Sequence, residues 1–397
     1  MIKLISNEKG VYMIVIADLW MCDKNHVPFN AAMVKILQGV FKTEKISFFG
    51  EKKHIDNIRS FIGSDGNISY HEVSQIKGGK IKHVIRELLA LYNLLKLVAF
   101  CKKKNVKLLV LLYMYPPSHY IFELFRKYFF QNQKIIIVLH GEVGWINEKE
   151  VKHRKICGCL LKSALELKKK DKNLKYITLG EVIMQNIVLN MDIQKELLIS
   201  IDHPYIYSPI PSRLPSFKPL SLASIGTADL TRNAHLIFEV GQKYKEYVDV
   251  GLLKLEIIGP MNPDIGKYAN KYVAYCKTNE KLSRLEYENK IAEIDYVLFF
   301  RDNNQYTMRA SGAFFDAIQF EKPIIAIKND YFEYYFKRFG NIGYLCENIE
   351  NLYRTIDYIL KNKPLAEYHE QLNNIRRAKE NLAITHIERD LKNKLVI

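Results

Sequence analysis

Two apolar runs with a helix-compatible segment between them, in residues 296–327, constrain the fold most strongly. The runs YVLFF and PIIAI have the length and the β-branched and aromatic content of buried strands. Residues 311–320 fit a short helix, so we predict a β-α-β unit. Ser311 and Gly312 stand where the loop enters this helix, so Ser311 can cap it and the free N–H groups of the first turn can bind an anion.

Two charged residues complete this anion site. Arg309 stands just ahead of the turn, and Asp316 lies one helical turn beyond Gly312, where it can accept hydrogen bonds from hydroxyl groups. A phosphate that carries a ribose fits this order of groups. An ordinary buried strand, helix and strand, with Ser311 only as a cap, fits the same residues.

Further motifs in the C-terminal half carry a family resemblance. Asp295, the Asp-Ala pair at Asp316 and the turn EKPI follow one another as in GT-B glycosyltransferases, and the chain most resembles their family 4. Upstream, Gly226 and Arg232 match the family's glycine turn and basic residue, and LEIIGP matches the next strand. The resemblance implies an α/β protein with two Rossmann-like doubly wound domains facing across a cleft. The expected donor-binding residues are Gly226, Thr227, Arg232, Gly259, Arg309, Ser311, Gly312 and Asp316.

The chain also departs from the family pattern. Met308 stands where many members have a glutamate that touches the sugar hydroxyls, so Arg309, Tyr306 or Asn304 would take over part of that contact. The glycine-rich loop that is common after the first strand is missing, because no glycine follows Gly10 there.

Several polar residues of the N-terminal half follow predicted strands, where parallel sheets bind ligands. Asp18, Asp23 and His26 follow the first strand, and His140 and Glu142 follow the strand KIIIV. The resemblance implies that a histidine in this region faces the sugar ring near the transferred carbon, so His140 and Glu142 are the expected catalytic residues. A structural histidine is the alternative for His140. An inverting enzyme would need a base near the acceptor hydroxyl, for which Asp18, Asp23 or His26 on the acceptor side could serve. A retaining enzyme would rely on the leaving phosphate and His140, and the resemblance favours retention.

The distribution of charge suggests a partner for the N-terminal half. Residues 1–210 hold 32 basic and 19 acidic residues, a net charge of +13, whereas the remaining residues carry only +3. Such a surface attracts anionic lipid or nucleic acid, and without a nucleic-acid motif we expect an anionic membrane and no nucleic acid. The basic residues are concentrated at 77–86 and 102–104.

A long helix predicted at residues 80–104 leaves two interpretations open. It is either a core helix with solvated ends or a membrane contact. Its apolar residues recur at helical spacing: Ile81, Val84, Ile85, Leu88, Leu91, Leu95 and Val98. The six cysteines show neither a zinc nor a disulfide pattern, and the N-terminal apolar run is too short for a membrane span. We therefore expect a cytoplasmic protein, peripheral at the inner leaflet of the plasma membrane.

Prolines and periodicity suggest the domain boundaries. Residues 1–208 form an acceptor-binding domain, four prolines mark 209–219 as a linker, 220–375 form the nucleotide-sugar domain, and a helix at 376–397 returns to the first domain. In detail, we expect a loop at 19–30 before a helix at 31–40, and one final helix at 364–394.

Together these features predict a hexosyltransferase that uses a nucleoside-diphosphate sugar and a glycan or lipid-linked glycan acceptor in surface polysaccharide synthesis. No cofactor is expected. The chain has no Asp-x-Asp motif, and arginine with a helix end can replace a metal ion, so we expect metal independence. The alternatives are a nucleotide-sugar epimerase of GT-B type and a non-catalytic protein that binds a nucleotide sugar.

Overall fold

The computed structural model divides the chain into two compact units. It describes residues 13–63, 67–78, 82–104, 106–130, 133–149, 151–167, 173–210, 213–276, 282–303 and 307–396. Unit 1 contains the described residues up to Ile206, together with Met308–Ala310 and the chain from Leu382 onward. Unit 2 contains Tyr207–Thr307 and Ser311–Asn381.

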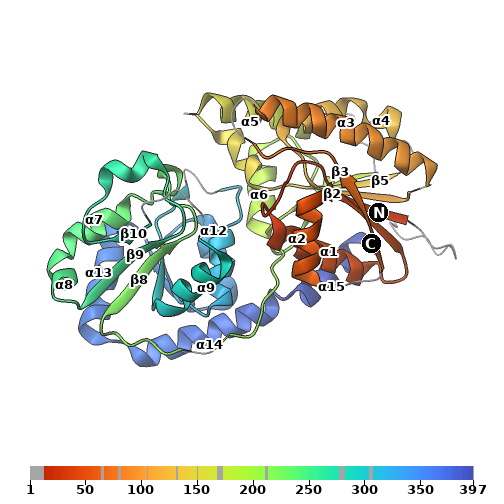
Figure 1. Ribbon diagram of the computed structural model, residues 1–397. Helices are drawn as coiled ribbons and strands as arrows, with labels where there is room; N and C mark the ends of the chain where they lie inside the picture. The colour runs from red at the N-terminus through yellow and green to blue at the C-terminus, as the bar shows by residue number, and fades with distance from the viewer. Residues whose placement is uncertain are drawn as a thin grey trace. The chain divides into compact units, whose positions relative to one another are not determined.

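Unit 1 is built on a seven-stranded parallel sheet with the order β3-β2-β1-β4-β5-β6-β7 (Figure 1). Its strands are β1 (Met13–Asp18), β2 (Lys45–Glu51), β3 (Ile68–Val73), β4 (Leu108–Tyr113), β5 (Lys134–Val138), β6 (Leu174–Thr178) and β7 (Leu198–Ser200). The central strands β1, β4 and β5 are apolar except at their ends, where Asp18 and Lys134 stand, because helices cover both faces of the sheet.

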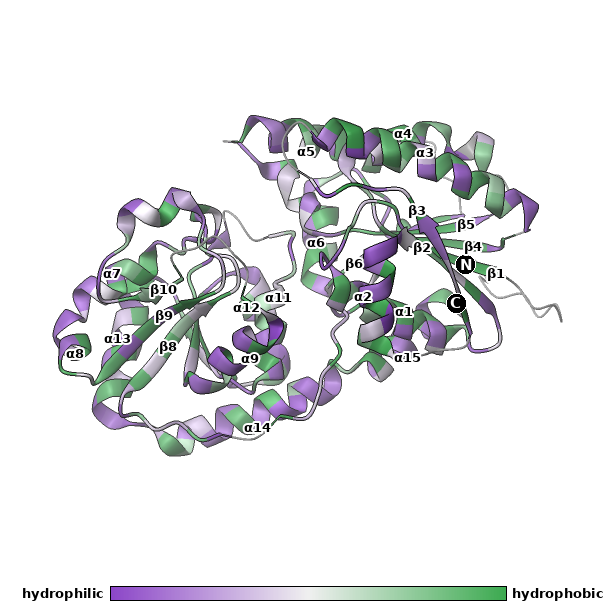
Figure 2. Cartoon of the chain, viewed as in Figure 1, coloured by the Kyte–Doolittle hydropathy of each residue, from purple (hydrophilic) through white to green (hydrophobic). Residues whose placement is uncertain are grey.

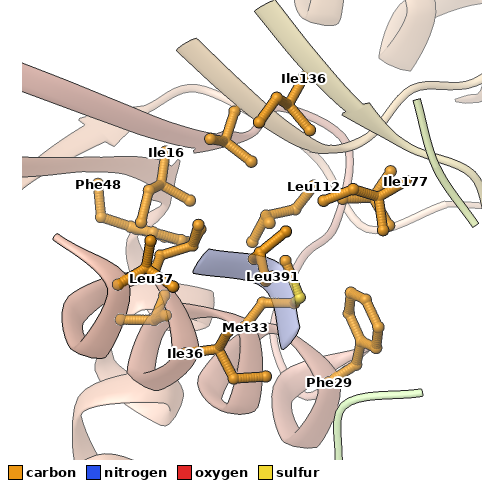
Figure 3. Close-up of a cluster of buried hydrophobic side chains, with 14 of the residues drawn as sticks. Ile16, Phe29, Met33, Ile36, Leu37, Phe48, Leu112, Ile136, Ile177 and Leu391 are labelled. Carbon is orange, nitrogen blue, oxygen red and sulfur yellow. The ribbon is translucent and has the colours of Figure 1, made fainter. Parts of the chain in front are cut away.

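The helices of unit 1 form two layers (Figure 1). One layer holds α1 (Val27–Val40), α2 (Lys52–Ile62) and α15 (Ile384–Val396). The other holds α3 (Lys82–Lys103), α4 (Pro116–Phe129) and α5 (Lys152–Leu165). The helix α6 (Glu181–Asn190) connects β6 to β7. Figure 3 shows the core beneath the first layer, where Leu391 of α15 lies beside Met33 of α1 in a cluster that also contains Ile136 of β5.

Unit 2 is built on a six-stranded parallel sheet with the order β10-β9-β8-β11-β12-β13. Its strands are β8 (Leu220–Ile225), β9 (Leu253–Ile258), β10 (Ala274–Tyr275), β11 (Tyr296–Phe299), β12 (Ile324–Ile327) and β13 (Gly343–Cys346). Its helices are α7 (Leu236–Lys243), α8 (Lys245–Asp249), α9 (Arg284–Glu293), α11 (Gly312–Gln319), α12 (Asp330–Phe339), α13 (Ile349–Asn362) and α14 (Leu365–Asn381). The predicted α/β class with two parallel-sheet domains is confirmed, and so is the β-α-β unit of β11, α11 and β12.

Two predicted helix boundaries are wrong. Helix α1 begins at Val27, four residues before its predicted start, because Pro28 fits the first turn of a helix, where no N–H donor is required. The predicted final helix is two helices, α14 and α15, because the chain passes from unit 2 to unit 1 after Asn381. No glycine or proline marks that break, so periodicity does not reveal it.

The chain passes between the two units at four places. The change from unit 1 to unit 2 falls after Ile206, and residues 376–381 belong to α14 of unit 2. The short segment Met308–Ala310 belongs to unit 1, although unit 2 precedes and follows it in the sequence. No sequence pattern indicated that Met308–Ala310 belongs to unit 1.

Candidate functional site

Each sheet has one place where the order of its strands reverses. In unit 2 it lies between β8 and β11, and in unit 1 between β1 and β4. The loops that follow the two strands diverge there, and open parallel sheets bind ligands in the resulting crevice. Most of the predicted site residues lie on loops or helix starts that follow these strands and their neighbours.

Two glycine turns lie at the carboxyl edge of the unit 2 sheet. Gly226 follows β8 with φ 85°, and Gly259 follows β9 with φ 142°, a conformation that side chains disfavour. A Cβ atom on Gly259 would collide with the backbone oxygen of Gly226. A Cβ on Gly226 would lie 3.7 Å from Cβ of Ala313 in the first turn of α11. Gly259 therefore lets the backbones of the two turns approach closely, whereas Gly226 is required by its positive φ.

The start of α11 contains the predicted cap. Oγ of Ser311 accepts a hydrogen bond from the backbone N–H of Phe314 at 3.3 Å, and the N–H of Ser311 donates to Oη of Tyr331 at 3.2 Å. Gly312 is exposed, and open space surrounds the position that its Cβ would occupy. The capping role of Ser311 is thus confirmed.

An arginine that the sequence reasoning missed lies at this helix start. Nη1 of Arg301 donates to Oγ of Ser311 at 3.0 Å, and the Arg301 side chain is buried. The backbone oxygen of Arg301 accepts from Nδ2 of Asn329 at 2.8 Å. Its position two residues after β11 was the available signal, because ligand-binding residues gather where parallel strands end. A guanidinium and the partial positive charge of a helix N-terminus are both attractive to an anion here.

Two other predicted donor residues of unit 2, Asp316 and Arg232, have side-chain partners of their own. Oδ2 of Asp316 accepts from the Tyr287 hydroxyl at 2.9 Å, and Nη1 of Arg284 lies 3.9 Å from its Oδ1. Arg232 ends the 3₁₀ turn η3 (Leu230–Arg232), where its guanidinium bonds to the Asp229 carboxylate. Thr227 is half-buried in the turn after Gly226.

Arg309 does not belong to the same unit as the α11 turn. It lies in unit 1, and a Cβ on Gly144 would collide with its side chain. Its positive charge acts on the carboxyl of Glu142. Met308, at the position of the family's glutamate, is buried. The candidates Asn304 and Tyr306 lie outside the described residues.

His140 lies beyond the end of β5 and opens the 3₁₀ helix η1 (Gly141–Asn147). Its Nε2 is 2.7 Å from the carbonyl oxygen of Leu112, and its ring packs edge-on against Phe29 at 4.4 Å between centroids. Because a carbonyl only accepts, the proton of the neutral ring is on Nε2. Burial, with lesser contributions from His26 and His203, holds the pKa of His140 well below its usual value.

Two further histidines lie near His140. The ring of His26, at the N-cap of α1, is 5.2 Å from that of His140, and the ring of His203 is 5.3 Å from Phe29. Burial, and to a lesser extent the charge of His26, lowers the pKa of His203 to about 4. The sequence reasoning did not include His203 as a site residue, although its place soon after β7 could have indicated it.

Glu142 is a buried carboxyl group directly beside His140. Its Oε1 accepts the backbone N–H of His140 at 2.9 Å. Burial raises the pKa of Glu142 to about 7, while that hydrogen bond and the charge of Arg309 act in the opposite direction. A carboxyl that titrates near neutrality can either give or take a proton.

The two predicted aspartates of the first loop are held by contacts within unit 1. Asp18 is fully buried; its Oδ1 accepts the backbone N–H of Met21 at 2.8 Å and its Oδ2 accepts Nδ2 of Asn30 at 2.7 Å. Asp23 pairs with Lys77 at 3.1 Å, and this hydrogen bond lowers the pKa of Asp23. Both carboxylates therefore order the loop that carries His26.

Neither a metal-binding cluster nor a membrane-spanning helix occurs in the described part of the chain. There, no group of three or more histidine, cysteine, aspartate or glutamate side chains could hold a metal ion. None of the helices in those same residues is long and apolar enough to span a membrane.

Comparisons with known proteins identify the fold. No protein-family model matches the sequence, and neither does any curated protein. Among solved structures, TarM from S. aureus is similar with a TM-score of 0.67 and 13% identity, over 98% of this chain and 100% of TarM. HepE from Anabaena, in complex with UDP-glucose, scores 0.65 at 11% identity, over 96% of this chain and 99% of HepE. Sucrose-phosphate synthase from Thermosynechococcus elongatus scores 0.65 at 11% identity, over 97% and 98% of the two chains. The chain thus has the two-domain GT-B fold.

Proposed function

We propose that this protein is a glycosyltransferase that takes a sugar from a nucleoside diphosphate. The observation that carries the proposal is the buried Arg301 at the N-terminus of α11, with its guanidinium on the capping Ser311. This cation and helix end lie at the reversal point of the unit 2 sheet, beside the turns at Gly226 and Gly259. Among the similar structures, HepE holds UDP-glucose and a TarM variant holds UDP, which supports a uridine diphosphate as the first donor to test.

The chemistry of transfer explains why such a site is useful. When the sugar leaves, negative charge collects on the diphosphate, and a fixed guanidinium with helix N–H groups stabilises that charge more in the transition state than before it. This arrangement supplies the electrostatic role of a metal ion, so we propose a metal-independent reaction without a cofactor. Asp316 would accept hydrogen bonds from the donor's hydroxyls, and Arg232 would exchange Asp229 for a phosphate oxygen.

In unit 1, His140 and Glu142 are the proposed catalytic residues. A buried, neutral His140 presents an uncharged imidazole to the reacting sugar, and Glu142 fixes the position of its backbone. Arg309 would act on Glu142 and on the negatively charged donor. Of the acceptor-side candidates, His26 is exposed and lies beside His140, so it is a better base than Asp18, which is fully buried.

The acceptor and the location are further parts of the proposal. We propose a glycan or lipid-linked glycan acceptor of surface polysaccharide synthesis, used at the cytoplasmic face of the membrane. The support is the net charge of +13 in residues 1–210, which attracts anionic lipid.

Calorimetry with UDP and GDP tests the donor site first. Replacing Arg301 by alanine removes a charge-assisted hydrogen bond of about 1.5–3 kcal/mol, so Kd should rise by roughly tenfold to 150-fold. Arg376→Ala is the matched control, because Arg376 is another arginine of unit 2 with a side-chain partner, bonded to Glu321 at 2.8 Å. Equal affinity in the parent and Arg301→Ala would show that the donor site is misplaced.

Product analysis separates the proposal from its alternatives. Transfer to an acceptor, or slow hydrolysis of the donor sugar, supports the transferase. Isomerisation of the donor sugar without any acceptor would identify the epimerase. Binding with no turnover would indicate a binding protein, the outcome that Met308 at the family's glutamate position favours.

A further inference from the structure

Helices α3 and α4 of unit 1 expose a broad apolar surface. In α4 the exposed apolar residues recur at positions i, i+3, i+4, i+7 and i+8, which is the spacing of a stripe on one helix face. In α3 the buried side chains face the sheet, and a second set of apolar side chains faces solvent. We name this surface the α3–α4 face; it consists of Val84, Ile85, Leu88, Tyr92, Leu95, Ile121, Leu124, Phe125, Tyr128 and Phe129.

The exposure of these side chains is large. Tyr128 is 71% exposed, Val84 66%, Leu88 62% and Leu95 56%. A groove of about 200 Å³ runs between the two helices, lined by apolar side chains such as Leu91 and Phe125. Figure 2 shows how much of α3 and α4 is hydrophobic. Monomeric soluble proteins rarely leave so contiguous an apolar surface in water, so it needs a partner.

The charges around the face are almost all positive. Exposed lysines flank it at Lys82, Lys96, Lys102 and Lys103, and Nζ of Lys96 lies 4.4 Å from the ring centre of Tyr92. The two helices contain only two acidic residues, and neither faces outward. Oε2 of Glu87 accepts from the hydroxyl of Ser118, and Glu123 is buried, bonded to Arg126 at 3.0 Å and to Tyr176 at 2.5 Å.

An apolar surface flanked by lysines favours an anionic lipid bilayer as its partner over a second copy of the chain. Two copies joined through the α3–α4 face would bring like charges together without acidic partners. An anionic bilayer offers hydrocarbon to the apolar side chains and head groups to the lysines that surround them. We propose that the α3–α4 face inserts into the interface of an anionic membrane, with both helices lying in its plane. This inference names the part of the chain that makes the membrane contact of the proposed function, and it rests on that function.

The mode of contact differs from purely electrostatic attraction. Two residues of the basic cluster at 77–86 are already engaged within unit 1, because Lys77 pairs with Asp23 and the buried Arg86 donates to the backbone oxygen of Trp20 at 2.8 Å. Salt screens charge pairs but not apolar burial, so part of the binding should persist in high salt.

Sedimentation with vesicles of phosphatidylcholine, alone or with phosphatidylglycerol, tests the proposal. The double variant Leu88→Gln and Phe125→Gln should bind mixed vesicles at least tenfold more weakly than the parent, and the parent should keep measurable binding in 0.5 M salt. Leu189→Gln is the matched control, since Leu189 is 81% exposed on α6 of the same unit. Equal binding by the double variant and the parent would overturn the assignment.

Fluorescence gives a second, direct reading. On binding to vesicles, the emission of the tryptophan introduced by Tyr128→Trp should shift to shorter wavelength and be quenched by lipids brominated in their acyl chains. The emission of the tryptophan introduced by Leu189→Trp should do neither. UDP calorimetry on the same proteins keeps the two proposals apart: intact UDP binding without insertion defeats only the membrane inference, and insertion without UDP binding defeats only the donor site. A concentration-dependent dimer in lipid-free solution, abolished in the double variant, would also overturn the membrane inference and would identify a second copy of the chain as the partner of the α3–α4 face.

Discussion

Replacing Glu142 by glutamine should make unit 1 more stable at high pH while leaving its stability at low pH unchanged. Burial raises the pKa of Glu142 from an ordinary value of 4.5 to about 7 in the folded protein. The folded protein therefore binds this proton more tightly than the unfolded chain does. Ionisation of Glu142 costs stability as the pH rises from about 4.5 to 7, and the cost is complete above that range.

The size of the effect follows from the same two values. Each pKa unit corresponds to about 1.36 kcal/mol, so the ionised Glu142 destabilises the fold by about 3 kcal/mol relative to its neutral form. Glutamine keeps the oxygen that accepts the His140 N–H at 2.9 Å and carries no charge. The variant should match the parent near pH 4.5 and exceed its free energy of unfolding by about 3 kcal/mol at pH 8.

Urea unfolding followed by tryptophan fluorescence measures this difference. The chain has two tryptophans, Trp20 and Trp145, and both belong to unit 1, so the signal reports on the unit that contains Glu142. Asp23→Asn supplies a control of opposite sign, because the Lys77 contact lowers the pKa of Asp23 and its stabilisation is lost as the pH falls. If the difference in free energy of unfolding between Glu142→Gln and the parent stays constant from pH 4.5 to 8, the argument is refuted.

Three further outcomes are expected. His140→Ala should lower kcat far more than donor affinity, because the role we propose for His140, beside the reacting carbon, is exerted mainly in the transition state. Steady-state kinetics and UDP calorimetry measure the two quantities. Gly259→Ala should destabilise unit 2 and weaken UDP binding. An alanine at φ 142°, colliding with the Gly226 oxygen, costs about 1–3 kcal/mol or more. Thermal unfolding with and without UDP tests this, and an unchanged melting temperature would contradict it. Asp316→Asn should weaken binding of nucleoside diphosphate but leave pyrophosphate binding nearly unchanged, as a comparison of the two ligands by calorimetry would show.

The local pattern of residues predicted the β-α-β unit and the helix cap at Ser311, and the family resemblance predicted the two parallel-sheet domains. Uniform apolar runs such as YVLFF indicate strands covered on both faces, and their alternation with helical segments implies parallel sheets. Ser311 was identified as a helix cap because capping depends only on residues within one turn. Gly226 and Gly259 were expected from the family resemblance, and in the structure both follow strands with positive φ.

What the tertiary structure alone decided depends on contacts between residues distant in sequence. It placed Arg309 with Glu142 and Gly144 in unit 1, and it brought Arg301 onto Ser311. It also decided which apolar stripe of α3 faces the sheet, since helical spacing gives the stripes but not their direction. The pKa values of His140 and Glu142 follow the same rule, because burial is set by every element packed around a group and not by its neighbours in the chain.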